Sequence, residues 1–110
     1  MKRITYCQIV FVSLVIVLLR GAGPVIAVER SGKMLFEDNC MVCHPNGGNG
    51  INPQKTLRKK DLAANNIRTE DDIVKIIRNP GPEMSRFDEK MLSDGDARKI
   101  ARYILSVLAK

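Results

Sequence analysis

The chain places two cysteines three positions apart, Cys40 and Cys43, directly before its only histidine, His44. Three positions is close to one helical turn, so both thiols face the same side of the backbone. That spacing lets them add to the two vinyl groups on one porphyrin edge, while the imidazole reaches the iron. The C-x-x-C-H string is typical of c-type haem attachment. It predicts a fold built around one covalently bound haem c, whose iron supplies the redox chemistry.

Three other sites also use closely spaced cysteines. A thioredoxin-like redox site needs a preceding strand, and nothing before Cys40 alternates like one. A structural zinc site needs four ligands, but the remaining cysteine, Cys7, lies far upstream. A disulfide between Cys40 and Cys43 would close a small, strained ring. Haem attachment is the interpretation that these residues favour.

Residues 1–27 resemble a cleavable secretory signal peptide. Lys2 and Arg3 give a positive start, Ile9–Leu19 is an apolar run, and small or tolerated residues lead up to Ala27. A retained membrane anchor is the alternative, but a spanning helix needs about 20 apolar residues and Arg20 ends the run. We expect cleavage after Ala27 and no membrane span afterwards. The expected location is the periplasm, with a membrane-associated or lumen-like compartment as the alternative.

The remaining residues, 28–110, form one small domain. A domain of this size is only marginally stable without an additional cross-link or cofactor, and a covalent haem would provide one. Three of the 18 basic residues precede residue 28 and all 12 acidic residues follow it, so this part has a net charge of +3. That value argues against nucleic-acid binding. The basic run Arg58–Lys60 is interpreted as a solvated helix face.

Helical periodicity dominates this part, and it predicts an all-α fold of about four helices packed around the haem. The expected helices are Gly32–Cys40 behind Ser31, Gln54–Ala64, one from Thr69 that closes before Asn79, and one from near Ser93. Pro45–Pro53 is expected to be a loop. The expected buried positions are Leu35, Phe36, Leu57, Leu62, Ile73, Ile76, Ile77, Ala97, Ile100, Tyr103, Ile104, Val107 and Leu108.

The face of the iron opposite His44 needs a second ligand or stays open. A methionine thioether is the natural partner of histidine, and it raises the reduction potential. Met34 precedes the attachment site on the wrong side, and Met41 sits between the cysteines. Met84 lies in a loop that two prolines and a glycine restrict to an extended path. We favour Met84 as the ligand over Met91 or an open site, and Met91 as a core residue.

With these motifs the chain resembles the class I monohaem c-type cytochromes, especially the cytochrome c6-like group. The resemblance covers residues 32–108 and rests on Gly32-x-x-x-Phe36, Cys40-x-x-Cys43-His44, Gly47-Gly48-Asn49, Thr56-Leu57, Gly81-Pro82-x-Met84-x-x-Phe87 and Tyr103. It implies that the first and last helices cross, with Gly32 and Phe36 packed against Ile100 and Tyr103. The family usually has proline directly after the ligand methionine, where this chain has Ser85. A looser methionine loop would follow.

The resemblance implies a one-electron carrier rather than an enzyme, in which His44 and Met84 bind the metal. We expect a monomer that meets redox donors and acceptors through a small, transient interface. A backbone carbonyl within Asn49–Pro53 is expected to accept the second His44 ring N–H. The expected apolar wall comprises Leu57, Leu62, Ile73, Ile77, Phe87, Leu92 and Ile104. The alternatives are a five-coordinate haem that binds small ligands or peroxide beside Ser85 or Arg86, and an electron-entry subunit of a respiratory complex.

Overall fold

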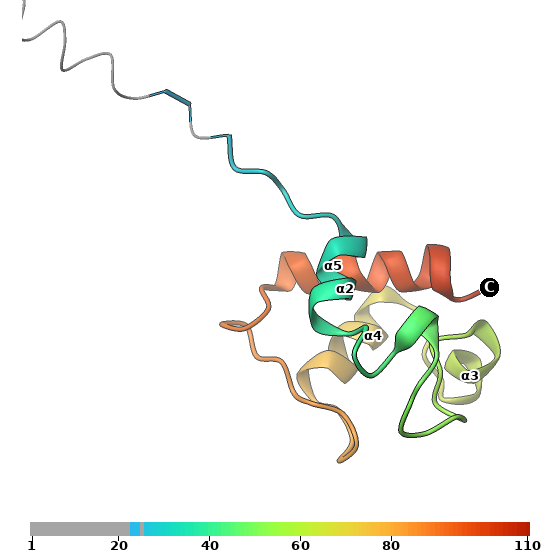
Figure 1. The fold of residues 1–110 in the computed structure, drawn as a ribbon. Coiled ribbons are helices and arrows are strands. Elements are labelled where there is room, and N and C mark those ends of the chain that lie inside the picture. The colour runs from blue at the N-terminus through green and yellow to red at the C-terminus, as the bar shows by residue number, and fades with distance from the viewer. Residues whose placement is uncertain (1–22, 25) are drawn as a thin grey trace, which may run out of the picture.

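The computed structural model describes residues 23–24 and 26–110, and this part of the chain is helical without any strand. Its elements are α2 (Gly32–Asn39), the 3₁₀ turn η1 (Pro45–Gly47), α3 (Lys59–Ala64), α4 (Glu70–Arg78), α5 (Asp94–Tyr103) and the π-turn η2 (Ile104–Leu108) (Figure 1). The all-α prediction is confirmed. Most of the expected signal peptide lies outside the described residues. No helix in the described part is long and apolar enough to cross a bilayer.

Of the four α-helices in the described part of the chain, three begin at the predicted capping residues. The side-chain oxygens of Ser31, Thr69 and Ser93 each accept a hydrogen bond from the backbone N–H three positions on. At Thr69 the cap is reciprocal, because the Asp72 carboxylate accepts from the Thr69 amide. These donations, with that of the Arg68 amide first, hold the pKa of Asp72 below its ordinary value.

The second helix is shorter than predicted, since α3 begins at Lys59 rather than at Gln54. The reason is that the preceding backbone donors are already used elsewhere. The Leu57 amide donates across the molecule to the Gly47 carbonyl oxygen at 2.8 Å, and the Thr56 hydroxyl accepts from the Arg58 amide at 3.2 Å. These bonds bend the chain through 54–58 and delay the start of the helix by five residues.

The last helix continues past Tyr103 as a wider π-turn. The Ala109 amide donates to the Ile104 carbonyl oxygen at 2.9 Å, five residues back. One extra residue in the turn changes which side chains face inward. Leu108 therefore stays buried, whereas Val107, which was predicted to belong to the apolar stripe, is exposed.

Helices α2 and α5 pack against each other, and α4 packs on α5 (Figure 1). A Cβ atom built on Gly32 would lie 2.2 Å from the Lys99 carbonyl oxygen, so only glycine fits at this crossing. Beside it the Phe36 and Tyr103 rings meet with their centroids 5.5 Å apart. The predicted packing of the first helix on the last is confirmed.

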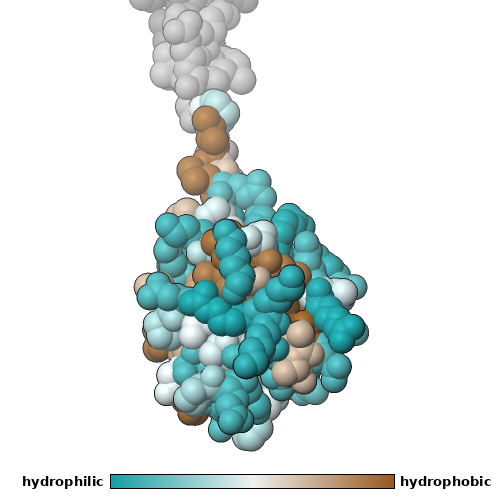
Figure 2. All heavy atoms as spheres, turned by 90° about the vertical axis from the view of Figure 1, so that its right-hand side faces the viewer, coloured by the Kyte–Doolittle hydropathy of each residue, from teal (hydrophilic) through white to brown (hydrophobic). Residues whose placement is uncertain are grey.

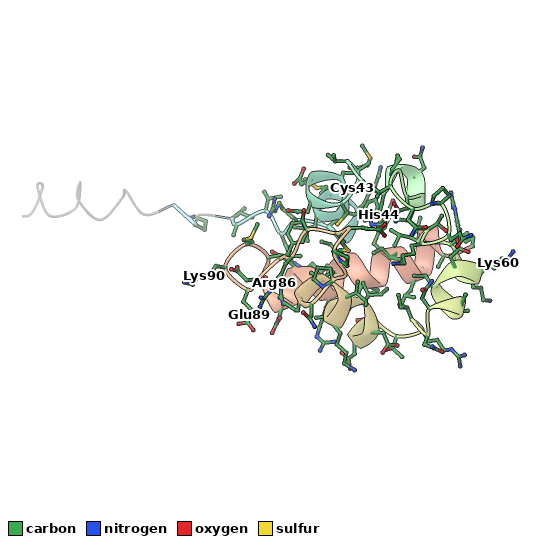
Figure 3. The ribbon with its side chains drawn as sticks, turned by 90° about the horizontal axis from the view of Figure 1, so that it is seen from below. Cys43, His44, Lys60, Arg86, Glu89 and Lys90 are labelled. Atoms are coloured by element: carbon green, nitrogen blue, oxygen red, sulfur yellow. The ribbon has the colours of Figure 1, made fainter. Side chains whose placement is uncertain are left out.

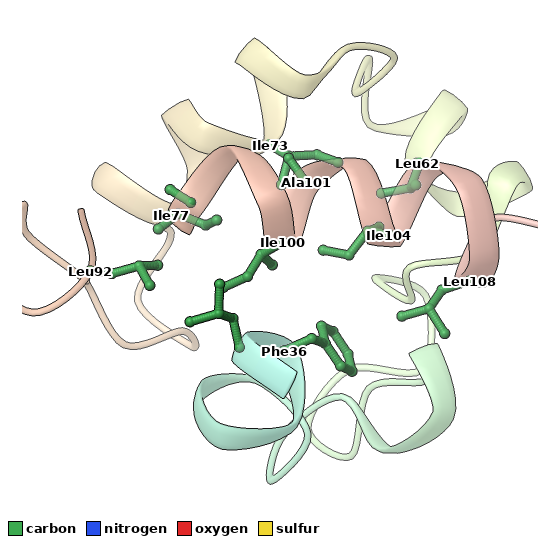
Figure 4. Packing of buried hydrophobic residues seen from close by; sticks show 11 residues of the cluster. Phe36, Leu62, Ile73, Ile77, Leu92, Ile100, Ala101, Ile104 and Leu108 are labelled. Atoms are coloured by element: carbon green, nitrogen blue, oxygen red, sulfur yellow. The ribbon is translucent and has the colours of Figure 1, made fainter. Parts of the chain in front are cut away.

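Helix α5 runs through the middle of the core, with α2 on one side and the α3–α4 segment on the other (Figure 4). Its buried residues are Leu35, Phe36, Leu62, Ile73, Ile77, Leu92, Ala97, Ile100, Ala101, Ile104 and Leu108. Ile76 was predicted to be buried with Ile73 and Ile77, but it is 39% exposed. The exposed part of its side chain lines the cavity described next.

Candidate haem site

A largely apolar cavity of about 280 Å³ opens beside the core. All four predicted site residues, Cys40, Cys43, His44 and Met84, contribute to its lining. They come from two segments far apart in the sequence, one directly after α2 and one between α4 and α5. The remaining apolar lining is formed by Phe36, Ile51, Leu57, Leu62, Ile67, Ile73, Ile76, Ile77, Ile100 and Ile104.

The two cysteines occupy different environments at the end of α2. Cys40 caps the helix and is half-buried, whereas Cys43 is exposed. Burial, with a smaller contribution from Cys43, raises the pKa of the Cys40 thiol to about 11. The His44 amide donates to the Cys40 carbonyl oxygen at 2.9 Å, so the motif forms one tight turn. In Figure 3, Cys43 and His44 project from this turn.

His44 is half-buried, and its ring is oriented by a backbone carbonyl. Its Nδ1 atom lies 2.8 Å from the Gly48 carbonyl oxygen. A carbonyl oxygen accepts only, so Nδ1 carries the proton and the Nε2 lone pair stays available to a metal. The expected acceptor range, Asn49–Pro53, was wrong by one residue, because the turn at Pro45–Gly47 folds back sooner than the loop composition suggested.

Met84 is half-buried and lines the cavity, whereas Met91 is 64% exposed and does not. The Met84 loop is attached to α4 by the Phe87 amide, which donates to the Ile77 carbonyl oxygen at 3.1 Å. The Arg78 guanidinium, on the same helix, donates to the Phe87 carbonyl oxygen at 3.0 Å. The structure therefore brings Met84 to the histidine site and leaves Met91 at the surface, contrary to the prediction that Met91 fills the core.

The wall differs from the expectation at two positions. Leu92 is buried in the core, and Phe87 packs against the core, but neither lines the cavity. Both follow Met84 in the sequence, and both pack on the core instead. Sequence reasoning missed the polar part of the lining, which comprises Asn49, Lys55, Thr56, Asp61, Asn65 and Glu83. The Thr56 hydroxyl donates to the Asp61 carboxylate, so this pair is satisfied within the wall.

Further charged groups lie at the two ends of the folded body. Lys60 lies at one end, and Arg86, Glu89 and Lys90 lie at the other (Figure 3). The face drawn in Figure 2 is mostly hydrophilic. Apolar side chains are prominent on the segment that leads into the body, where Ile26 and Val28 are exposed.

The donor set fits a covalently attached haem. Two thiols, an imidazole with a defined free nitrogen and a thioether lie around a single cavity whose other walls are mainly hydrocarbon. No cluster of three metal-binding side chains of the zinc type occurs in the described residues. Histidine, methionine and paired cysteines are the groups that hold haem iron and porphyrin in proteins.

Comparison with known proteins supports the interpretation of this site as a haem site. The family model described as "Cytochrome C oxidase, cbb3-type, subunit III" matches residues 27–104. Cytochrome c6 from Cyanidium caldarium is 40% identical over 75 residues, 68% of this chain and 67% of that protein. Cytochrome c6 from Rippkaea orientalis is 33% identical over 96% of this chain and 94% of that protein. The chain belongs to the class I c-type cytochromes, in their cytochrome c6-like group.

A solved structure shows the same fold in this family. The cytochrome OmcF, outer membrane cytochrome F from Geobacter sulfurreducens, superposes with a TM-score of 0.69 at 44% identity, over 73% of this chain and all of that one. The protein described here, as a c6-like cytochrome, is an electron carrier rather than an enzyme, and its cofactor is haem c with iron. It exchanges electrons with redox partners.

Proposed function

We propose that this cytochrome carries single electrons through a haem whose iron is bound by His44 and Met84 and whose edge is fixed by Cys40 and Cys43. The observation that supports this assignment is the shared cavity. Four side chains of the required chemistry, from segments about forty residues apart, line one apolar space. Bound there, the haem supplies reversible one-electron exchange at its iron.

The chain's own residues hold and tune this centre. The Gly48 carbonyl fixes the tautomer and the orientation of the His44 ring. The hydrocarbon wall, including Leu57, Ile73 and Ile104, excludes water and disfavours the more highly charged iron state. Met84, as the second ligand, would act in the same direction on the reduction potential.

Electron exchange needs a partner to approach the cavity edge. Cys43 is exposed, and the neighbouring Val42 is 91% exposed, so this edge is open to contact. A small, transient interface fits such a surface, and we propose that the carrier meets donors and acceptors there as a monomer. We also propose that residues 1–27 direct export, with the periplasm as the working compartment.

Substitution of Met84 tests the ligand assignment. The absorption spectrum of the oxidised wild-type protein is expected to contain an iron–sulfur charge-transfer band. Met84→Ala is expected to lose this band, and the matched control Met91→Ala is expected to keep it because Met91 lies outside the cavity. A band that persists in Met84→Ala would contradict the assignment. A high-spin spectrum of the wild-type protein would favour the five-coordinate alternative, with ligand or peroxide binding beside Ser85.

The matched family description names an oxidase subunit, and this observation favours a second candidate. In that candidate the same site serves as the electron-entry subunit of a respiratory complex. Size-exclusion chromatography of a native extract separates the two candidates. Elution at the size of the free chain supports the diffusible carrier, and elution with a large complex supports the subunit.

A further inference from the structure

Three successive carbonyls, beginning two residues after His44, each accept a hydrogen bond from a different donor. The Asn46 oxygen accepts from Arg58 Nη2 at 2.7 Å, and the Gly47 oxygen accepts from the Leu57 amide at 2.8 Å. The Gly48 oxygen accepts from His44 Nδ1 at 2.8 Å. The first two donors are adjacent residues. Residues 57–58 therefore hold the peptide that orients the histidine ring.

This peptide needs external support because its backbone is unfavourable. Asn46 and Gly47 adopt consecutive left-handed conformations, with φ values of 52° and 82°. Glycine adopts this region without penalty and asparagine tolerates it better than most residues, but the Asn46 conformation still costs free energy that surrounding contacts must offset. Gly47 is also buried, and a Cβ atom built there would lie 3.3 Å from Leu108 Cβ.

The Arg58 guanidinium also joins this loop to the end of the last helix. Its Nη1 atom donates to the Leu108 carbonyl oxygen at 3.2 Å, one of the carbonyls that a helix end leaves without an internal partner. The same planar group thus satisfies two carbonyls from segments 62 positions apart in the sequence. A lysine has one compact ammonium group and does not reproduce this fork. The run Arg58–Lys60 is therefore not a uniformly solvated face, as its composition had suggested.

We propose that Arg58 is a positioning residue for His44. It holds Asn46 to Gly48 in place, so that the Gly48 carbonyl fixes the orientation and the basicity of the imidazole. The inference rests on the proposed function, in which His44 is the iron ligand. Arg58 has no role in electron exchange with the partner in this assignment. Its effect reaches the centre through the loop backbone.

The test compares Arg58→Met with Lys59→Met in the full haem-containing protein. Both variants lose one positive charge, but the exposed Lys59 side chain makes no ion pair with any residue from 23–24 or 26–110. NMR measures the solvent exchange rate of the His44 ring Nδ1–H and of the Ile100 amide, which reports on global unfolding. Loss of a charged hydrogen bond predicts ring exchange about tenfold faster or more in Arg58→Met. The Ile100 amide should accelerate less, and Lys59→Met should leave both rates unchanged.

Arg58→Lys is expected to give an intermediate ring exchange rate, because it keeps the charge but not the fork. Equal acceleration of the ring proton and the Ile100 amide would overturn the proposal, since Arg58 would then only secure the last helix. Unchanged ring exchange in Arg58→Met would also overturn it. The ligand assignment is tested separately, since paramagnetic shifts of the His44 ring in oxidised wild-type protein identify it as the ligand. Their absence would defeat the proposed function whatever the Arg58 variants show.

Discussion

Gly32 is the residue at which the first and last helices come closest. Its missing side chain lets α2 rest on the backbone of α5, and the nearest Lys99 atoms are main-chain atoms that have no freedom to rotate away. At a tight backbone contact of this kind, the size of the side chain decides which residue fits, and its polarity does not. The same argument does not apply to Gly95 in α5, whose added Cβ would meet nothing nearer than Ser93 Oγ at 4.0 Å.

Gly32→Ala is therefore expected to destabilise the protein by about 3 kcal/mol, because the helices must separate to admit the methyl group. For a domain of this size the thermal midpoint should fall by more than about 10 °C. Thermal unfolding followed by far-UV circular dichroism measures the change. Gly95→Ala is the matched control and should be neutral or slightly stabilising. Equal midpoints for the two variants would contradict the steric argument.

Among the elements, the loop between α4 and α5 depends on one arginine. The Arg78 side chain is only 20% exposed, and besides donating to Phe87 it pairs with Asp94 at 2.6 Å. It thus joins the end of α4, the Met84 loop and the start of α5. Since Ser85 replaces the proline that usually follows the family's ligand methionine, this contact restrains a loop that lacks its usual stiffness.

Arg78→Met is expected to weaken the proposed bond between Met84 and the iron. Added imidazole should then displace the methionine more easily, with an apparent affinity at least about fivefold higher than that of the wild type. Absorbance titration of the oxidised protein measures it. Arg98→Met is the control, because it removes an α4–α5 ion pair with Asp71 that does not involve the loop. The same affinity in both variants would show that Arg78 does not restrain Met84.

The elements also show where sequence reasoning succeeds. The caps at Ser31 and Thr69 were predictable because each is a bond between residues three positions apart. The start of α3 was not, because it depends on the bond from Leu57 to Gly47 across the loop. The π-turn after Tyr103 has no local composition signal either. The extra residue in this turn is recognised only in the structure, where Val107 is exposed and Leu108 is buried.

The residues of the candidate site also divide into those that could be predicted from the sequence and those that could not. Cys40, Cys43 and His44 form a contiguous motif, so their chemistry could be read directly from the chain. Met84 could be ranked above Met91 from loop composition, but its place at the cavity depends on the tertiary fold. The role inferred for Arg58 was not predictable. Its two carbonyl partners, on Asn46 and Leu108, are brought together only by folding.

At the scale of the whole molecule, the cavity is lined by several residues of the helical core, among them Phe36, Ile73 and Ile100. A small domain has a total stability of only about 5–15 kcal/mol, and apolar walls that surround about 280 Å³ and lack haem contacts would lower it. The polypeptide alone is therefore expected to be close to the unfolding threshold, and haem attachment supplies the missing interior contacts.

A Cys40→Ala/Cys43→Ala double variant, which cannot form thioethers, tests this dependence. We expect it to lose most of its helical circular dichroism at 25 °C. Val42→Ala, at the 91%-exposed position between the two cysteines, is the control and should keep the wild-type spectrum. A double variant that is as helical and as thermally stable as the control would show that the polypeptide core suffices.

The contact between Gly32 and Lys99 joins the two ends of the domain. Such sequence-distant pairing is slow to form, and it is impossible until the residues from Gly32 to Lys99 are all available to fold. The chain therefore remains open until then. Throughout that interval the two thiols that we propose as attachment points stay accessible to the enzymes that join them to haem, and the closure of α2 on α5 completes the fold.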